Sequence, residues 1–228
     1  MRRIVMTILL ALSAIPAQAQ DAKDAGGKEA GETAAKKWTP LFNGEDLEGW
    51  SDAMDNNSSW QVVAGMILGQ GGGQQQPGVL VTERQDYVNF RLRVVFNYRD
   101  PGTGGVIEVR RSSPADGVSS SYGVSTHLHP NRMKVPTPGA VQRRKDYRYG
   151  TAAPQRRATE KLIPAAAQRW HTLEIRVVGN RITTWLNGRK ADEFTDSKGS
   201  FPSGGIALVC RGDSAVLFRE VSIIEIAE

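Results

Sequence analysis

Hydrophobic side chains recur at every second position in several short segments, and this period restricts the fold more than any other feature. One face of residues 90–98 carries only large hydrophobic side chains: Phe90, Leu92, Val94, Phe96 and Tyr98. Such alternation predicts a half-buried antiparallel strand, and it recurs in residues 173–177. No long segment with a helical period follows the first 19 residues. The sequence therefore predicts an all-β sandwich or barrel.

Turn residues separate the predicted strands. Asn187-Gly188 stands between two alternating segments, and both residue types tolerate positive φ, so we expect a type I′ hairpin. Residues 69–78 are rich in glycine, but no lysine and no helix follow them to complete a phosphate-binding loop. We expect a flexible hairpin loop there. The long irregular stretch from Pro130 to Ala167 is the kind of excursion that often has a function.

The N-terminal segment predicts export. Residues 1–19 contain two arginines, an apolar run and a final Ala17-Gln-Ala19, which together are typical of a cleaved bacterial signal peptide. Residues 20–37 hold no large apolar side chain and predict a flexible linker. Residues 38–228 remain as one domain. The apolar run is too short to span a bilayer, so we expect a periplasmic or secreted protein without a membrane span.

Cysteine content and charge limit the classes of function. Cys210 is the only cysteine, so no intramolecular disulfide can form, and its apolar neighbours indicate a small buried residue rather than a catalytic thiol. The net charge of +5 is too small to indicate a nucleic-acid partner. Basic residues do gather between positions 143 and 161, which predicts either a solvated loop or a site for an anionic partner: Arg143, Arg144, Lys145, Arg148, Arg156, Arg157 and Lys161.

A charged pair lies in a predicted strand at residues 106–110. Alternation places Glu108 and Arg110 on one face, with Ile107 and Val109 on the other. Glu108 would then be a general base and Arg110 a partner for an oxyanion. The alternative is an exposed ion pair between neighbouring strands.

Histidines supply the other candidates for acid–base chemistry. Period two places Ser125, His127 and His129 on the face shared with Gly123. Two histidines at such spacing can act as acid and base, contact a sugar or share a metal, although polar surface is the simpler interpretation. His171 follows Trp170, whose ring would stack on a pyranose or pack in the core.

Ordered phrases along the chain resemble one protein family, the 3-keto-disaccharide hydrolases. The resemblance covers residues 38–226 and rests on the order of these segments: Leu41-Phe-Asn-Gly44, Leu47-Glu-Gly-Trp50, Trp60-Gln-Val-Val-Ala-Gly65, Leu186-Asn-Gly188 and Val216-Leu-Phe-Arg219. It implies a single-domain concanavalin A-like jelly-roll β-sandwich, of the type found in lectins and glucanases. It also implies an activity on sugars oxidised at C3.

The same resemblance marks where this chain differs from its family. Gly123 and Ser125 stand where the family carries glutamate and glutamine. His171 stands at the family's asparagine, Gln142 at its tyrosine and Arg211 at its histidine. The fold is retained while the polar positions are changed, and a fold alone does not determine function.

These observations together predict an exported protein that cleaves a 3-keto-disaccharide or a related glycoside by general acid–base chemistry. The predicted catalytic residues are Glu108, His127, His129 and His171, and the predicted substrate contacts are Arg110, Ser125, Gln142, Trp170 and Arg211. No cofactor and no resident metal are predicted. Two alternatives remain open, namely a non-catalytic carbohydrate-binding domain and an envelope interaction protein that uses the basic cluster.

Overall fold

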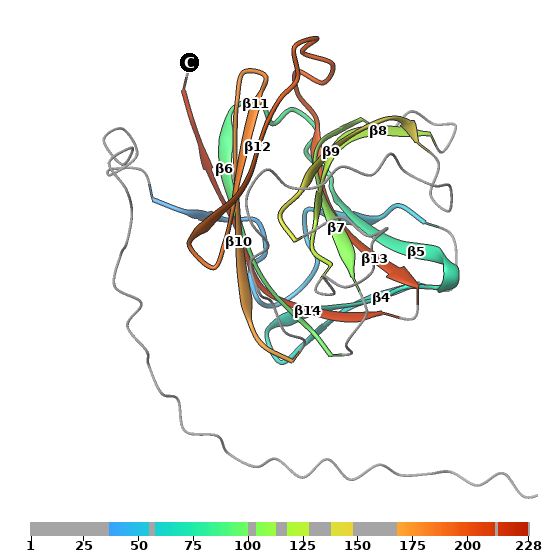
Figure 1. The fold of residues 1–228 in the computed structure, drawn as a ribbon. Coiled ribbons are helices and arrows are strands. Elements are labelled where there is room, and N and C mark those ends of the chain that lie inside the picture. The colour runs from blue at the N-terminus through green and yellow to red at the C-terminus, as the bar shows by residue number, and fades with distance from the viewer. Residues whose placement is uncertain are drawn as a thin grey trace, which may run out of the picture.

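Two antiparallel β-sheets packed face to face form the protein (Figure 1). The computed structural model describes residues 37–54, 58–99, 104–112, 118–127, 138–147, 168–212 and 214–227. The predicted signal peptide, nearly all of the predicted linker and most of the stretch from Pro130 to Ala167 lie outside the described residues. Within the described residues we find no helix long and apolar enough to cross a membrane.

The first sheet, called sheet A, contains β1 and the strands that carry the alternating pattern. Its order is β12 (Arg189–Thr195), β11 (Arg181–Leu186), β10 (His171–Val178), β6 (Phe90–Tyr98), β14 (Ala215–Glu225), β4 (Met66–Gln70) and β3 (Ser59–Val63), and β1 (Thr39–Pro40) pairs with β14. The second sheet, called sheet B, has the order β2 (Trp50–Asp52), β5 (Gly73–Thr82), β13 (Gly205–Gly212), β7 (Gly105–Ser112), β8 (Ser119–Ser125) and β9 (Val141–Tyr147).

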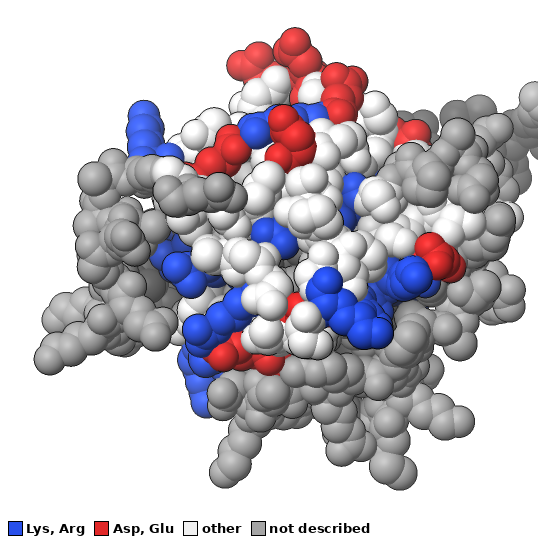
Figure 2. All heavy atoms as spheres, turned by 90° about the horizontal axis from the view of Figure 1, so that it is seen from above, with Lys and Arg blue, Asp and Glu red and all other residues white. Residues whose placement is uncertain are grey.

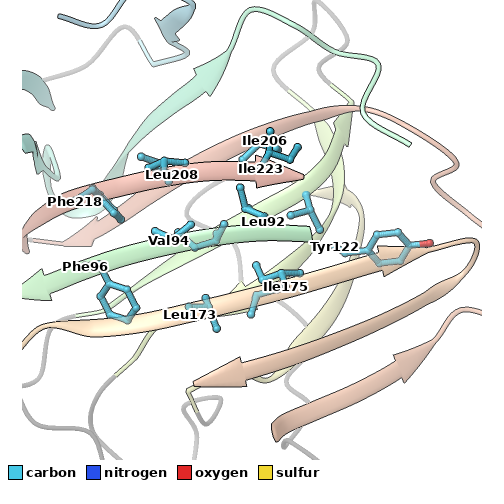
Figure 3. Packing of buried hydrophobic residues seen from close by; sticks show 14 of the residues in the cluster. Leu92, Val94, Phe96, Tyr122, Leu173, Ile175, Ile206, Leu208, Phe218 and Ile223 are labelled. Carbon is cyan, nitrogen blue, oxygen red and sulfur yellow. The ribbon is translucent and has the colours of Figure 1, made fainter. Parts of the chain in front are cut away.

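The core fills the space between the two sheets. Figure 3 shows side chains of β6, β10 and β14 packed together, and they belong to one buried cluster with Ile206 and Leu208 of β13 and Tyr122 of β8. The alternation in β6 and β10 follows directly, because every second residue must enter this layer. The all-β sandwich predicted from the sequence is confirmed. Cys210 is also part of this cluster, and complete burial raises the pKa of its thiol.

The predicted type I′ hairpin is present between β11 and β12. Asn187 has a φ of 52° and Gly188 a φ of 76°, which are the left-handed values that this turn requires. The Asn187 side chain also accepts a hydrogen bond at 3.0 Å from the backbone N–H of Thr172. The turn is thereby attached to the start of β10.

The glycine-rich segment is not the flexible hairpin loop that its composition predicts. β4 ends at Gln70 in sheet A and β5 begins at Gly73 in sheet B, so the chain passes from one sheet to the other. Gly69 lies where a Cβ atom would come within 2.7 Å of the Cys210 sulfur and would overlap the ring of Trp60. Glycine is needed there for close packing rather than for flexibility.

Replacement of Gly69 by alanine tests this close approach. Because the added methyl group would overpack the contact with Trp60 and Cys210, we expect Gly69→Ala to lower the free energy of unfolding by about 1–3 kcal/mol. Urea denaturation measures the change. Ser59→Ala on the neighbouring exposed strand is the control and should change stability by less than about 0.5 kcal/mol. Wild-type stability in Gly69→Ala would contradict the packing described here.

Candidate functional site

The candidate site is the outer face of sheet B, which points away from the core. Ile107 and Val109 of β7 enter the core, so Glu108 between them points outward. The strand register opposes Glu108 to Ala207 on one side and to Gly123 on the other, and Gly123 to Gln142. Because opposed residues of antiparallel strands share a face, these positions form one row across the sheet.

This outer face has an apolar half and a polar half. The apolar half is a separate buried cluster of Val79, Val81, Val106, Ala207 and Val209 on β5, β7 and β13. The polar half lies on β7, β8 and β9, and its side chains are at most 6% exposed: Glu108, Arg111, Ser121, Ser125, Gln142 and Arg144. Buried polar groups of this kind cost free energy unless they are hydrogen-bonded, and such groups are concentrated at functional sites.

Glu108 is held between two arginines. Its side chain is fully buried; Arg144 Nη1 donates to Oε1 at 2.7 Å and Arg111 Nε donates to Oε2 at 3.1 Å. The exposed ion pair considered as an alternative is therefore wrong, because the pair is buried. A carboxylate with a guanidinium on each oxygen is engaged by protein groups and not by a substrate. In this arrangement Glu108 positions the two arginines.

The glycine at position 123 makes room for Arg144. A Cβ atom on Gly123 would lie 3.0 Å from both Cδ and Nε of Arg144 and 3.0 Å from Val106 Cγ1. The Arg144 side chain therefore crosses the space above Gly123 to reach Glu108 on the next strand. The position at which the resemblance places a family glutamate is occupied here by the side chain of an arginine.

Arg110 does not share a face with Glu108, contrary to the prediction from alternation. Arg110 has a φ of 49° and lies in a bulge where the register shifts between Val109 and Ser112. The extra residue reverses the alternation, so Arg111 points outward in its place. The Arg110 guanidinium instead donates to the carbonyl oxygens of Val88, Gly179 and Phe201 at 2.6–3.1 Å. It thus joins sheet B to sheet A.

His127 lies just beyond the end of β8, next to Ser125 and Arg211. Ser125 Oγ is 3.3 Å from His127 Nδ1, and the ring packs against Gly104, whose carbonyl accepts a hydrogen bond from Arg211 N at 3.3 Å. Burial lowers the pKa of His127, and the positive charges of Arg211 and Arg144 lower it further, to about 4. The imidazole is therefore neutral at neutral pH. His129 lies outside the described residues.

The remaining candidates, His171 and Trp170, are not brought to this face. His171 points into the core from β10, where its ring lies 5.7 Å from that of Phe96 and its Nδ1 accepts a hydrogen bond from Asn187 Nδ2 at 3.1 Å. Sheet B separates it from Glu108. Trp170 is 37% exposed and Arg219 of β14 stacks on it at 4.7 Å, so the expected core packing is wrong.

Sequence reasoning missed Arg111, Arg144 and Ser121. All three sit on the outer face of sheet B, but alternation counted from Glu108 selects Arg110, and Arg144 was assigned to the basic cluster. The basic cluster did contain one indication of this placement. Its first members, Arg143 and Arg144, follow Val141 within β9. Strand register, which the sequence does not state, brings Arg144 opposite Ser121 and near Glu108.

The described members of the basic cluster do not form a continuous basic surface. Arg144 is buried, Arg143 lies 3.6 Å from Asp196, and Lys145 lies 3.9 Å from Asp146. Figure 2 shows described basic side chains in several separate groups, with uncharged and acidic ones between them. Residues 148–161 lie outside the described residues.

Ligands for a metal ion were also sought. Within the part of the chain that the structure describes, no three His, Cys, Asp or Glu side chains come together to hold a metal.

The architecture is that of a lectin-like jelly-roll sandwich. A galectin-like protein from Bacillus subtilis superposes with a TM-score of 0.62 at 8% identity, covering 83% of this chain and 94% of the other. The carbohydrate binding module CBM66 from the same organism gives 0.55 at 15%, covering 76% and 93%. A proposed glycosyl hydrolase from Parabacteroides distasonis gives 0.57 at 22%, covering 83% and 100%. These likenesses confirm the predicted fold.

A family model identifies the chain more narrowly. Residues 37–224 match the 3-keto-alpha-glucoside-1,2-lyase-like domain, and the chain belongs to that family. The resemblance drawn from the ordered phrases is thereby confirmed. No curated protein matches the sequence significantly.

The position of Arg110 predicts a structural role that stability measurements can detect. Arg110→Met removes the donors to three carbonyl oxygens and should lower the free energy of unfolding by on the order of 3 kcal/mol. Arg176→Met, on the outer face of sheet A, is the matched control and should change it little. If Arg110→Met were as stable as the control, the joining role of Arg110 would be refuted.

The lowered pKa of His127 predicts an acid-sensitive component of stability. Between about pH 4 and its ordinary value of 6.5, the unfolded histidine binds a proton that the folded one does not, so stability falls as the pH falls through this window. His127→Gln should therefore lose less stability than the wild type between pH 7 and pH 4.5. Urea denaturation at the two pH values measures this, and equal losses in both proteins would contradict it.

Proposed function

We propose that the outer face of sheet B binds a carbohydrate and that the chain cleaves a 3-keto-glycoside there. The observation that carries this proposal is the division of one buried face into an apolar half, with Val79 and Val209, and a polar half around Glu108. Sugars have the matching character, because a pyranose ring has an apolar face and a rim of hydroxyl groups. The family to which the chain belongs supports the choice of an α-glucoside oxidised at C3.

The chemistry of such a substrate requires little from the protein. A ketone at C3 acidifies the hydrogen on C2, so a general base can remove it and form an enolate. The enolate then expels the oxygen at C1: the C1–O bond breaks, a C1=C2 double bond forms, and the leaving group takes up a proton. Addition of water to the double bond completes a net hydrolysis. The two carboxylic acids of ordinary glycosidases are not needed.

His127 is the described group that we assign as the base, because it is an imidazole on this face. The pKa of its imidazole is lowered to about 4, so the ring is unprotonated at neutral pH. It neighbours Arg211, whose charge favours a negatively charged enolate. Ser125 contacts the same ring and orients it. Glu108 was the other candidate base, but it is committed to Arg111 and Arg144 and acts as their anchor.

A non-catalytic carbohydrate-binding domain is the second candidate. It is favoured by one specific observation, namely that both oxygens of Glu108 accept hydrogen bonds from arginines, which leaves this carboxylate engaged by the protein. Either function is consistent with export, which we propose on the basis of residues 1–19.

The two candidates differ in turnover. We expect the protein to consume a 3-keto-α-glucoside but not its unoxidised parent, with transient absorbance from the conjugated ketone followed by released monosaccharide. His127→Gln should lower kcat/KM by on the order of a hundredfold, because the base is removed. His171→Gln is the matched control, since that histidine lies in the core, and the folded fraction of this variant should retain wild-type turnover.

Binding of the keto-glucoside without turnover by the wild type would select the binding domain instead. Equal loss of activity in His171→Gln and His127→Gln would remove the assignment of His127. Absence of both binding and turnover in folded protein would refute the proposed function.

A further inference from the structure

Arg111 has hydrogen-bonding capacity that no group among the described residues uses. Its side chain is only 6% exposed, and its single described contact runs from Nε to Glu108 Oε2. Its Nη1 is buried and has no hydrogen-bond partner in the part of the chain that the structure describes. A guanidinium carries five N–H donors, and a buried donor without an acceptor costs about 1–3 kcal/mol, more when it is charged. Such a group is available to an acceptor on a bound ligand.

Two further donors on the same face have the same property. Gln142 Nε2 is buried without a partner among the described segments, and so is Ser121 Oγ, whose residue is 0% exposed. The register places Gln142 opposite Gly123, which is in turn opposite Glu108, and places Ser121 two residues before Gly123 on β8. Arg111, Gln142 and Ser121 therefore surround Glu108 from three neighbouring strands.

The unused donor of Arg111 belongs to a cation. Its guanidinium shares the carboxylate of Glu108 with Arg144, and Arg111 Nη1 makes no hydrogen bond to the described residues. A neutral hydroxyl of a sugar would satisfy this donor but would bring no opposite charge to the guanidinium. An anionic group would satisfy the donors and the charge together, and charge-assisted hydrogen bonds are roughly twice as strong as neutral ones.

We propose that the carbohydrate bound by this face carries a carboxylate, as a uronic acid does, and that the carboxylate binds Arg111 Nη1 with Gln142 Nε2 and Ser121 Oγ beside it. This inference rests on the proposed function, since it assigns the substrate class of the same face. The carboxylate subsite is separate from the reacting end. Gln142 is opposite Gly123. Gly123 precedes His127 by four residues, which corresponds to roughly 13 Å of extended chain. A disaccharide can bridge this distance.

Matched pairs of disaccharides test the inference. Isothermal titration calorimetry compares α- and β-linked glucosyl-glucose with the corresponding glucuronosyl-glucose, which differ only in the oxidation of C6. We expect the acid of at least one linkage to bind about tenfold or more tightly than its neutral counterpart, and this preference to weaken as salt is added. Arg111→Gln should abolish the preference, whereas Arg176→Gln, on the outer face of sheet A, should retain it.

Gln142→Leu keeps the side-chain volume and removes Nε2, so it gives an independent test should Arg111→Gln fail to fold; it should reduce the preference severalfold. Equal affinity for neutral and acidic sugars would overturn the carboxylate inference and leave the proposed function intact. A preference that persists in Arg111→Gln would overturn the assignment of the subsite. Failure of folded protein to bind any of the disaccharides or the keto-glucoside would contradict the proposed function itself.

Discussion

The bulge at Arg110 is the constraint on which both the closure of the sandwich and the composition of the candidate site depend. A regular β7 would send Glu108 and Arg110 outward and Arg111 inward. At the bulge, where Arg110 has a positive φ, β7 contains one residue more than the strand paired with it. Arg110 therefore points inward and Arg111 points outward. Arg110 can then donate to backbone carbonyls at the end of sheet A, and Arg111 can reach Glu108. A left-handed arginine is strained, and the four residues that accept hydrogen bonds from Arg110 stabilise that conformation.

The polar half of the outer face shows how a site can change while its sheet does not. Gly123 leaves a space that Arg144 fills, and Arg144 then neutralises one oxygen of Glu108. The absence of a side chain at Gly123 on β8 is thus coupled to the course of a side chain from β9. The consequence is electrostatic, because the guanidinium of Arg144 lies over Gly123 and beside Glu108. A guanidinium in this place favours anions or developing negative charge.

Much of the fold could be predicted from the sequence, because burial in a sheet imposes a period of two that residues 90–98 and 171–178 display. The Asn187-Gly188 turn could also be predicted, since few residue pairs accept two positive φ values. The residues of the candidate site could be predicted only in part. Glu108, Ser125 and His127 were selected by face counting and Gln142 by the family resemblance, and the structure brings them to one face. Arg111 and Arg144 were missed because a bulge and a cross-strand register are set by tertiary contacts. Composition likewise misled at Gly69, where glycine serves packing against Trp60.

His127 links the electrostatics of the face to its chemistry. A histidine without perturbing neighbours is half protonated near pH 6.5, and a protonated ring cannot accept a proton from carbon. Burial opposes protonation of His127, and the charges of Arg211 and Arg144 act in the same direction. In the proposed reaction Arg211 would therefore perform two tasks: it would keep the base neutral before reaction, and it would stabilise the enolate that forms once the proton has moved. After that transfer in the proposed reaction, the new imidazolium would lie beside Arg211, and their repulsion would promote release of the proton to the departing oxygen.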